Sequence, residues 1–340
     1  MALYVDDLLL LSNSLKDLIS LKQDLSKRFE MKDLGEAHFI LGIQIERDRS
    51  THTLALSQES YIKKIVERYG MSESKSVATP LDPGVKLSKA DCPTTTEQAA
   101  EMKNVPYQSA VGAIMYAMLG TRPDITFSVT AISQFSSNPG KPHWVAVKRV
   151  LRYLHGTMNY KLVYGGIDGY KIPPSPIGYC DADWGSNVDD RRSVTGYVFI
   201  VAGGAISWQA KKQPTVALSS VEAEYMAATQ ATKEAIWLRL FFKGLGLGHI
   251  LATPSLIYSD SQGSIALAKN PEYHSRTKHI DVQHHFVREQ VASNVVCFKF
   301  IGTELMAADV MTKALARNKH HDMIALMGVK STMSGSVENH

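Results

Sequence analysis

The chain has 340 residues, of which 44% are hydrophobic and 21% charged, and its formal net charge is +4. This length accommodates about two domains, and the composition is that of an ordinary globular protein. The charge is compatible with nucleic-acid binding without requiring it. No apolar stretch approaches the ~18 residues of a membrane span, which argues against a membrane protein.

The cysteines predict a reducing environment. Cys92, Cys180 and Cys297 are scattered along the chain, so they give neither a disulfide framework nor a CxxC zinc site. The N-terminus has no basic region and carries Asp6 and Asp7 before its apolar run, which is not the pattern of a signal peptide. We therefore expect an intracellular protein, cytoplasmic or nuclear, without a membrane partner.

The chain begins with the stretch LYVDDLLLL, in which two aspartates separate short apolar runs. Two apolar strands around an acidic turn form a plausible metal-holding hairpin, and an ordinary Asp-Asp turn fits the same residues. Adjacent residues of an extended chain point to opposite faces. At most one of Asp6 and Asp7 is therefore aimed at a given ion.

Hydrophobic periodicity and turn residues predict the elements that follow. Up to residue 70 these are a helix, two strands and a second helix, at 15–30, 38–48, 52–57 and 57–69. Residues 72–105 are polar and contain prolines, and we interpret them as a linker or extended wrap. Three helices then lie between 106 and 155, each opened or immediately preceded by a proline.

After residue 165 the pattern changes to several short β-prone runs, followed by alternating helices and strands. This order is typical of a mixed sheet covered by helices. The changes in character divide the chain into four predicted parts, namely 1–78, a helical connection at 79–165, a sheet-containing domain at 166–320 and a polar C-terminal tail at 321–340.

Three aspartates of the C-terminal half lie where a carboxylate is unexpected. Asp181 shares one face of a strand with hydrophobic residues, and Asp183 has the same parity and is the competing candidate. Asp260 ends a strand where the chain passes into a helix, and Asp309 interrupts an apolar helix. Turn or cap positions also explain Asp181 and Asp260, and an exposed helix side also explains Asp309.

Glu224 lies near the start of a long helix predicted from about 220 to 243. Ser219 and Glu222 fit a capping box, which gives Glu222 a structural role. Glu224 instead begins a stripe of small residues that is expected to lie flat against a sheet, namely Ala227, Ala228, Ala231 and Ala235. Its carboxylate is then aimed at the sheet edge, where an unpaired charge is costly. The alternative is a charge favoured by the helix dipole.

Taken together, these four carboxylates predict a metal site. Acids gathered in one cleft repel, so their pKa values rise unless cations join them. Ligand sets made only of oxygen select hard ions, so Mg²⁺ is the expected occupant.

The sequence resembles the C-terminal part of a copia-type retrotransposon polyprotein. The stretches that carry the resemblance cover nearly the whole chain in the order of the family: LYVDDLLL, FILGIQIERD, LSQESYIKKIVERYGM, ATPLDPG, PYQSAVGAIMYAMLGTRPDITFSV, SQFSSNPGKPHWVAVKRVLRYLHGT, GYCDADWGSNVDDRRSVTGYVF, ISWQAKKQPTVALSSVEAEYMA, IYSDSQGSIALAKNP, RTKHIDVQHHFVRE and AADVMTKAL. Such families carry a reverse transcriptase followed by a ribonuclease H (RNase H) domain. The resemblance therefore implies a mixed α/β, RNase H-like five-stranded sheet with flanking helices in 166–320.

The resemblance implies hydrolysis of the RNA strand of RNA–DNA hybrids with two Mg²⁺ ions, or Mn²⁺ in their place. The RNase H carboxylates fall on Asp181, Glu224, Asp260 and Asp309. Asp181 is expected to contact both ions, Glu224 and Asp260 to hold one, and Asp309 the other. The alternative is a catalytically inactive relic that at most binds nucleic acid.

Basic and aromatic residues near the sheet are candidates for holding nucleic-acid phosphates. They are Arg191, Arg192, Trp208, Lys211 and Lys212. Solvated loop charges beside a core tryptophan are the alternative interpretation.

Two departures from the family pattern bear on activity. The YVDD stretch resembles the polymerase active-site hairpin, but the fingers and most of the palm would precede it. We therefore expect Asp6 and Asp7 to be vestigial and polymerase activity to be lost, with 1–78 a palm and thumb remnant. Many cellular RNases H also have a histidine in a loop before the last aspartate, and FKFIGTELMAAD contains none. The candidates to replace this histidine are His279, His284 and His285. The alternative is that they are surface or helix-capping residues.

Overall fold

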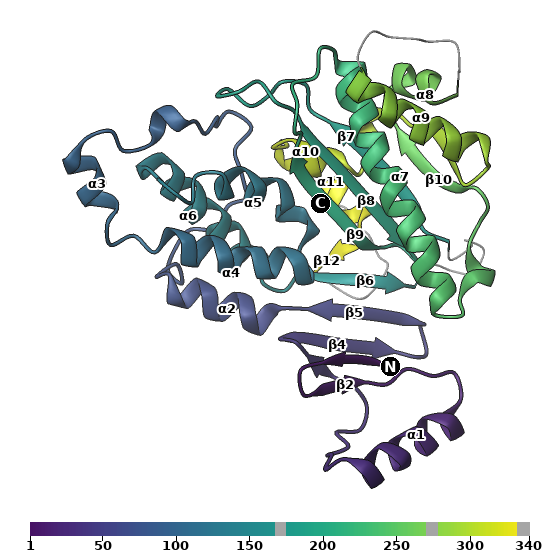
Figure 1. Ribbon diagram of the computed structural model, residues 1–340. Coiled ribbons are helices and arrows are strands. Elements are labelled where there is room, and N and C mark those ends of the chain that lie inside the picture. Colours follow the sequence, from purple (N-terminus) through teal and green to yellow (C-terminus); the bar gives the residue numbers. More distant parts are fainter. Residues whose placement is uncertain (167–174, 270–277, 332–340) are drawn as a thin grey trace.

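The structure, a computed structural model, describes residues 1–166, 175–269 and 278–331. It contains an α/β part built on a five-stranded main sheet, a group of helices beside it, and a second five-stranded sheet (Figure 1). No helix among the described residues is long and apolar enough to cross a membrane.

The main sheet has the strand order β11-β10-β7-β8-β9. Its strands are β7 (Ile177–Ala182), β8 (Val194–Val201), β9 (Gly204–Lys212), β10 (Ser255–Ser259) and β11 (Val296–Phe300). β7, β8 and β9 are antiparallel neighbours, whereas β10 runs parallel to both β7 and β11. This mixed sheet, covered by helices, is the RNase H-like fold that the resemblance implied, so the predicted fold class is confirmed.

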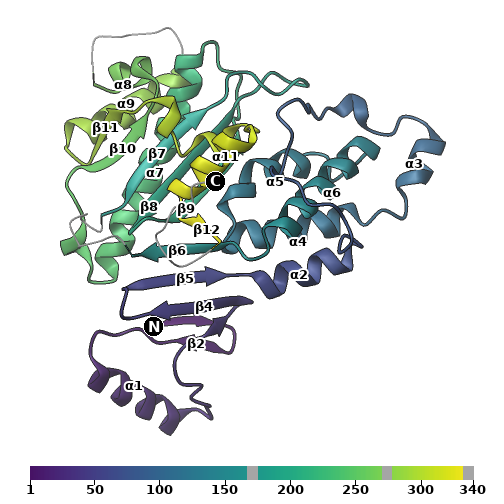
Figure 2. The same cartoon turned by 180° about the vertical axis from the view of Figure 1, so that it is seen from behind.

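Helices cover both faces of the main sheet. α7 (Ser220–Gly244), α8 (Gln262–Lys269) and α9 (Lys278–Ala292) lie on one face (Figure 1). α10 (Asp309–Thr312) and α11 (Arg317–Leu326) lie on the other, which faces the viewer in Figure 2.

α7 lies flat on the sheet because it presents small side chains there. Ala227, Ala228, Ala231 and Ala235 are at most 2% exposed and belong to the same core as Phe199 and Ile257 of the sheet. The predicted alanine stripe is therefore confirmed as the buried face of the helix.

The second sheet joins distant segments in the order β12-β6-β5-β4-β3. Its strands are β3 (Phe39–Ile40), β4 (Ile43–Asp48), β5 (Thr53–Ser57), β6 (Lys161–Gly165) and β12 (Val329–Lys330). The single strand predicted at 38–48 is split into β3 and β4 at Leu41 and Gly42, which both have positive φ.

The prediction of a polar tail from residue 321 is wrong up to residue 330. α11 buries Met323 and Ile324, and the chain then returns as β12 to pair with β6. The apolar residues of this segment are few and separated, so only their packing against β6 and the main sheet reveals that they are structured. Residues 332–340 lie outside the described part of the chain.

The segment between β5 and β6, two neighbouring strands of the second sheet, is mainly helical. Its helices are α2 (Glu59–Arg68), α3 (Thr96–Met102), α4 (Tyr107–Gly120), α5 (Thr126–Ser133) and α6 (Lys141–Gly156). Short 3₁₀ turns occur in this segment at Lys89–Asp91 and Pro123–Ile125. Two others, at Gly248–Ile250 and Thr303–Leu305, lie in the part that contains the main sheet. The three helices predicted between 106 and 155 are confirmed, whereas the predicted linker at 72–105 also contains α3.

A buried polar network joins this helical connection to α11. Arg122 and Asp124 are fully buried and form an ion pair of 2.7 Å. The Tyr153 hydroxyl donates to Asp124 at 2.7 Å, and His320 of α11 lies 3.0 Å from the same hydroxyl. The helical connection and α11 are therefore in direct contact through buried polar groups.

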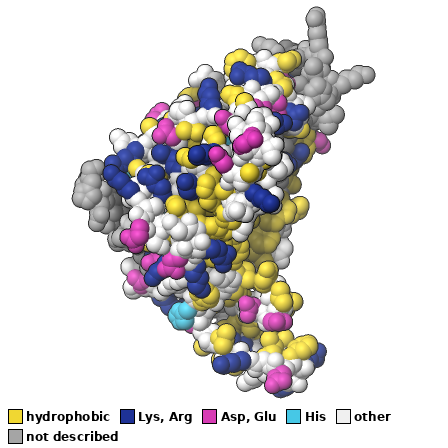
Figure 3. Space-filling view, turned by 90° about the vertical axis from the view of Figure 1, so that its left-hand side faces the viewer, with side chains coloured by type: hydrophobic (Ala, Val, Ile, Leu, Met, Phe, Trp, Pro, Cys, Tyr) yellow, Lys and Arg dark blue, Asp and Glu magenta, His cyan; other side chains and the backbone are white. Residues whose placement is uncertain are grey.

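The N-terminal segment is the most exposed part of the described chain. β1 (Ala2–Tyr4) and β2 (Asp7–Leu9) form a hairpin, and α1 (Leu15–Arg28) has no buried residue. Figure 3, which views the left-hand side of Figure 1, shows hydrophobic side chains continuing down to this lower end of the molecule. Val5 in the hairpin turn has a φ of 51°, which is unusual for a β-branched residue.

Candidate active site

Two of the predicted site residues leave neighbouring strands at the same edge of the main sheet. β7 and β10 are parallel, with Tyr258 opposite Tyr179. Two residues further along each strand, the same register brings Asp260 beside Asp181. Asp181 is 1% exposed, whereas Asp260 lies just beyond the end of β10 and is partly exposed.

The third carboxylate, Glu224, comes from the first turns of α7. The Ser219 hydroxyl accepts the backbone N–H of Glu222 at 3.1 Å and starts the helix there. The Glu222 carboxylate accepts the N–H of Leu218 at 2.8 Å, one residue earlier than in the predicted capping box. With Glu222 engaged in this cap, Glu224 turns toward the sheet edge.

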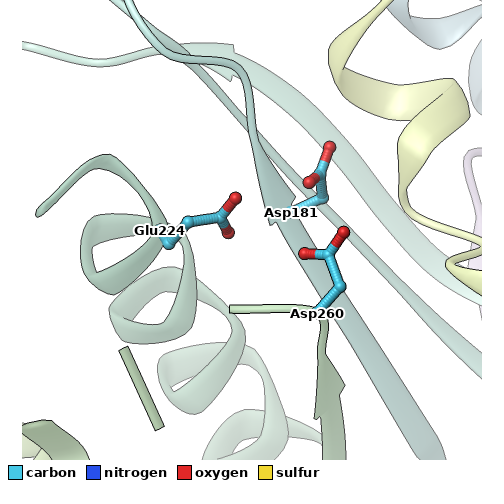
Figure 4. Close-up of side chains that lie close together, drawn as sticks. All are labelled: Asp181, Glu224 and Asp260. Atoms are coloured by element: carbon cyan, nitrogen blue, oxygen red, sulfur yellow. The ribbon is translucent and has the colours of Figure 1, made fainter. Parts of the chain in front are cut away.

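Asp181, Glu224 and Asp260 form one group. An oxygen from each carboxylate lies within 4.8 Å of the other two, and the three side chains point toward one another (Figure 4). They come from a central strand, a helix start and the end of a second strand. No other group of three or more acidic, histidine or cysteine ligands occurs among the residues that the structure describes.

The electrostatics of this group are unfavourable for the bare chain. Burial, together with Asp181 and Asp260, raises the pKa of Glu224 to about 9, although the backbone of Ala182 donates a hydrogen bond to it. The Glu224 Oε2 atom is buried and has no hydrogen-bond partner. Burial also raises the pKa of Asp181 to about 6, against the opposing effect of Lys313. The arrangement holds acids whose charge the surrounding protein does not fully balance.

Asp309 does not join this group of three. It is completely buried at the start of α10, where its two oxygens form ion pairs with lysines. Lys313 Nζ lies 2.7 Å from Asp309 Oδ1, and Lys319 Nζ pairs with Oδ2. Lys313 Nζ also lies 3.4 Å from Asp181 Oδ2, so an ammonium group separates Asp309 from Asp181.

A glycine lets α10 approach the sheet closely enough for these contacts. Gly196 of β8 is paired with Asp181, and a Cβ atom at this position would lie 2.6 Å from Met311 Cβ and 2.7 Å from Thr312 Cγ2. With α10 seated on this glycine, the Thr312 hydroxyl donates to Asp181 Oδ2. The site therefore depends on residues from both faces of the sheet.

Asp183, the competing candidate, has a different position. Its carboxylate accepts hydrogen bonds from the backbone of Val194 and the hydroxyl of Ser186, which closes the loop between β7 and β8. The structure thus brings Asp181, and not Asp183, together with Glu224 and Asp260.

The candidate nucleic-acid residues divide into three kinds. Trp208 of β9 packs against the core beneath α10 and α11. This is the core position that the sequence analysis gave as the alternative to a role in nucleic-acid binding. Lys212 pairs with Asp190 at 2.7 Å, and Arg192 lies 3.7 Å from the same carboxylate. Arg191 and Lys211 are exposed.

The remaining candidates lie apart from this site. Asp6 lies in the turn of the N-terminal hairpin and Asp7 pairs with Tyr4, at the far end of the molecule from α10 (Figure 1). His285 is exposed on α9, and the side chains of His279 and His284 lie outside the described residues.

The sequence interpretation missed Thr312 and Lys313. The spacing of Asp309 and Lys313, four residues apart in a helix, does indicate an ion pair. The contacts of both residues with Asp181 depend on how α10 docks, which no local pattern indicates.

Comparison with known proteins places the chain among transposon polyproteins. Residues 1–83 match the family described as reverse transcriptase (RNA-dependent DNA polymerase). The retrovirus-related Pol polyprotein from transposon TNT 1-94 of Nicotiana tabacum is 50% identical over 97% of the chain, which spans 24% of that polyprotein. The putative transposon Ty5-1 protein of Saccharomyces cerevisiae is 34% identical, over 68% of this chain and 72% of that protein.

Solved structures resemble part of the chain. LC11-RNase H1 in complex with an RNA/DNA hybrid aligns with 41% of this chain and 94% of its own, with a TM-score of 0.31 and 16% identity. With a TM-score this low, the similarity does not strengthen the fold assignment, which rests on the strand order of the main sheet.

Proposed function

Because the chain belongs to the copia-type retrotransposon Pol polyprotein family, we propose that it hydrolyses the RNA strand of RNA–DNA hybrids at the edge of its main sheet. The observation that carries this proposal is the convergence of Asp181, Glu224 and Asp260 from three chain segments, with oxygens within 4.8 Å of one another. The chain spans about a quarter of the TNT 1-94 polyprotein, so the activity is proposed for this part alone.

The residues present fit a divalent metal ion. The group offers only carboxylate oxygens, which select hard ions such as Mg²⁺, with Mn²⁺ as a substitute. The unpartnered Oε2 of Glu224 and the raised pKa values of Glu224 and Asp181 indicate missing positive charge. A cation held between the three carboxylates supplies it.

The residues of the site then have distinct roles. When bound, Mg²⁺ polarises the scissile phosphate and lowers the pKa of an attacking water. Asp181 lies between the Glu224–Asp260 pair on one side and Asp309 on the other. The Thr312 hydroxyl fixes the rotation of the Asp181 carboxylate. Asp260 is oriented by the Thr303 hydroxyl, which donates to its Oδ2 at 2.9 Å. Glu224 closes the site from the helix side with its free oxygen.

Two exposed cations lie at the same sheet edge and support nucleic-acid binding. Ala182, next to Asp181, pairs with Thr195, which in turn pairs with Lys211. Since neighbouring strands are about 4.8 Å apart, Lys211 lies on the order of 10 Å from β7. Arg191 precedes β8 at this edge. We expect both side chains to contact phosphates, and RNA to be selected by groove shape and 2′-hydroxyl groups.

The test is cleavage of a labelled RNA–DNA hybrid by the full chain with Mg²⁺. Asp260→Asn keeps the size of the side chain and removes one carboxylate, and we expect a loss of at least about 100-fold. Asp322→Asn is the matched control because Asp322 is exposed on α11, away from the group. Cleavage by Asp260→Asn at the wild-type rate would contradict the site. No cleavage by the wild-type chain would favour the inactive relic, a nucleic-acid-binding remnant.

Polymerase activity is not proposed for this chain. Two-metal phosphoryl transfer needs carboxylates that converge from several segments, and within the described residues no third ligand groups with Asp6 and Asp7. Primer extension on an RNA template is expected to give no product, and extension by the wild-type chain would show this expectation to be wrong.

A further inference from the structure

The gap between Asp181 and Asp309 is filled by an ammonium group of the chain itself. Lys313 Nζ lies 3.4 Å from Asp181 Oδ2 and 2.7 Å from Asp309 Oδ1. The acidic site therefore has two unlike sides. On the Glu224–Asp260 side no lysine or arginine pairs with the carboxylates among the described residues, whereas on the Asp309 side a cation is already present.

The backbone fixes the position of Lys313. It directly follows α10, and its N–H donates to the carbonyl of Asp309 at 3.1 Å. The preceding residue, Thr312, donates to the same Asp181 oxygen that Lys313 approaches. The close seating of α10 on Gly196 thus places the ammonium as well as the hydroxyl.

Asp309 depends on lysines for its charge balance. Its carboxylate is completely buried, and the groups that pair with it are Lys313 and Lys319. A buried carboxylate without a counterion is strongly unfavourable. A cation is therefore required beside Asp309, and either an ammonium group or a metal ion can supply the charge.

We propose that Lys313 is an internal counterion that occupies the Asp181–Asp309 side of the site, so that a second divalent ion binds there only when the ammonium leaves. This inference rests on the proposed function and adds to it an order in which the two metal ions bind. The Glu224–Asp260 side takes the first ion, and the second ion competes with Lys313. The two ions consequently bind with different affinities.

The exposure of Lys313 gives the ammonium a route out. Its side chain is 39% exposed, in contrast to the buried carboxylates that it joins. A phosphodiester backbone passing this edge attracts the ammonium away from the gap. Binding of nucleic acid then favours binding of the second ion, which links full loading of the site to the presence of substrate.

Counting bound ions tests this without measuring cleavage. The full chain is titrated with Mn²⁺ by calorimetry, and bound Mn²⁺ is counted by electron paramagnetic resonance. For the wild type we expect one ion to bind and a second to bind at least about tenfold more weakly, because a positive charge within a few ångströms disfavours a cation by this factor or more. Lys313→Met should tighten the second ion about tenfold, whereas Lys313→Arg keeps the wild-type pattern.

Lys319→Met is the matched control. Lys319 pairs with Asp309 but has no ion pair with Asp181, so its removal leaves the gap occupied and the wild-type pattern unchanged. An equal gain in Lys319→Met, an unchanged second affinity in a folded Lys313→Met, or two ions of equal affinity in the wild type would each overturn the inference. The last result needs no variant to fold. Hybrid cleavage by the wild type together with any of these results would leave the proposed function standing and remove only Lys313 from it.

Discussion

The chain buries carboxylates in two regions, and their surroundings shift the pKa values of these groups in opposite directions. In the helical connection, Asp124 is paired with Arg122 at 2.7 Å and accepts the Tyr153 hydroxyl, and these partners lower its pKa despite complete burial. At the edge of the main sheet, burial and neighbouring acids raise the pKa of Glu224 to about 9 and leave one of its oxygens without a partner. Burial of an acid is common to both regions. What distinguishes the candidate active site is charge that the protein does not satisfy.

The largest expected effect comes from removing the charge of Asp124, the buried carboxylate that is paired. Asp124→Asn leaves the Arg122 guanidinium buried without a counterion, which typically costs about 3–5 kcal/mol of unfolding free energy. Urea denaturation measures this loss. Asp82→Asn is the control, because the pair of Asp82 with Arg149 is 3.5 Å long and partly exposed, and such pairs contribute about 0–1 kcal/mol. Equal losses in the two variants would remove the contrast between the regions.

The corresponding change at the sheet edge is expected to have the opposite sign. Without metal, Glu224→Gln removes a carboxyl group that the folded chain must keep protonated at neutral pH, and it should stabilise the fold by about 1–3 kcal/mol at pH 7.5. The same variant should lose hybrid cleavage. Glu222→Gln is the control on the same helix, because glutamine still accepts the N–H of Leu218. Destabilisation by Glu224→Gln would show that the carboxylate is satisfied after all.

A third variant tests how the two faces of the sheet are joined. Gly196→Ala places a Cβ 2.6 Å from that of Met311, so α10 must move, at a cost of about 1–2 kcal/mol. The movement also shifts Thr312 and Lys313 away from Asp181, and hybrid cleavage should fall with the thermal stability.

Gly112→Ala is the control for this glycine. In α4, a Cβ at residue 112 meets nothing within 4 Å, and alanine in a helix is favoured by about 0.5–1 kcal/mol. A Gly196→Ala chain with unchanged stability and cleavage would mean that the close seating of α10 is not needed.

The same contrast explains which features the sequence could reveal. Glu224 and the alanine stripe of α7 follow one helical period, and Asp181 and Asp260 lie at or just past the ends of strands in the sequence. These are local patterns, and the structure places the three acids together. The paired acid, Asp124, is not indicated by the sequence: its ion-pair partner Arg122 is local, but their burial and the hydrogen bond from Tyr153 depend on helices that are distant in the chain.

The features that the sequence did not reveal depend on long-range packing. α11 and β12 are structured because β6 and the main sheet receive them, although their own residues indicate a polar tail. The contact between Lys313 and Asp181 spans more than a hundred residues and requires the glycine of a third segment. Asp309 stands out in the sequence because it interrupts an apolar helix, whereas its pairing with two lysines depends on how that helix and α11 pack.

The smallest expected effect concerns pH and metal together. The pKa of Glu224 is about 9 when folded and near 4.5 when unfolded, so between these values the folded chain binds a proton that the unfolded chain does not. The free energy of unfolding therefore falls as pH rises from about 4.5 to 9, and Asp181 adds to the fall between about 3.8 and 6. We expect Mg²⁺ to bind the deprotonated carboxylates and to reverse this loss.

Adding Mg²⁺ at about ten times its dissociation constant should thus stabilise the chain by about 1.4 kcal/mol at pH 8.5 and much less at pH 5, where protons occupy the site. Thermal melts at both pH values, with and without Mg²⁺, measure the difference. The Glu224→Gln chain should show little of it, while Asp124 contributes nothing to it because its charge is balanced by Arg122 at both pH values. Equal stabilisation by Mg²⁺ at the two pH values would mean that the ion binds somewhere other than the three carboxylates.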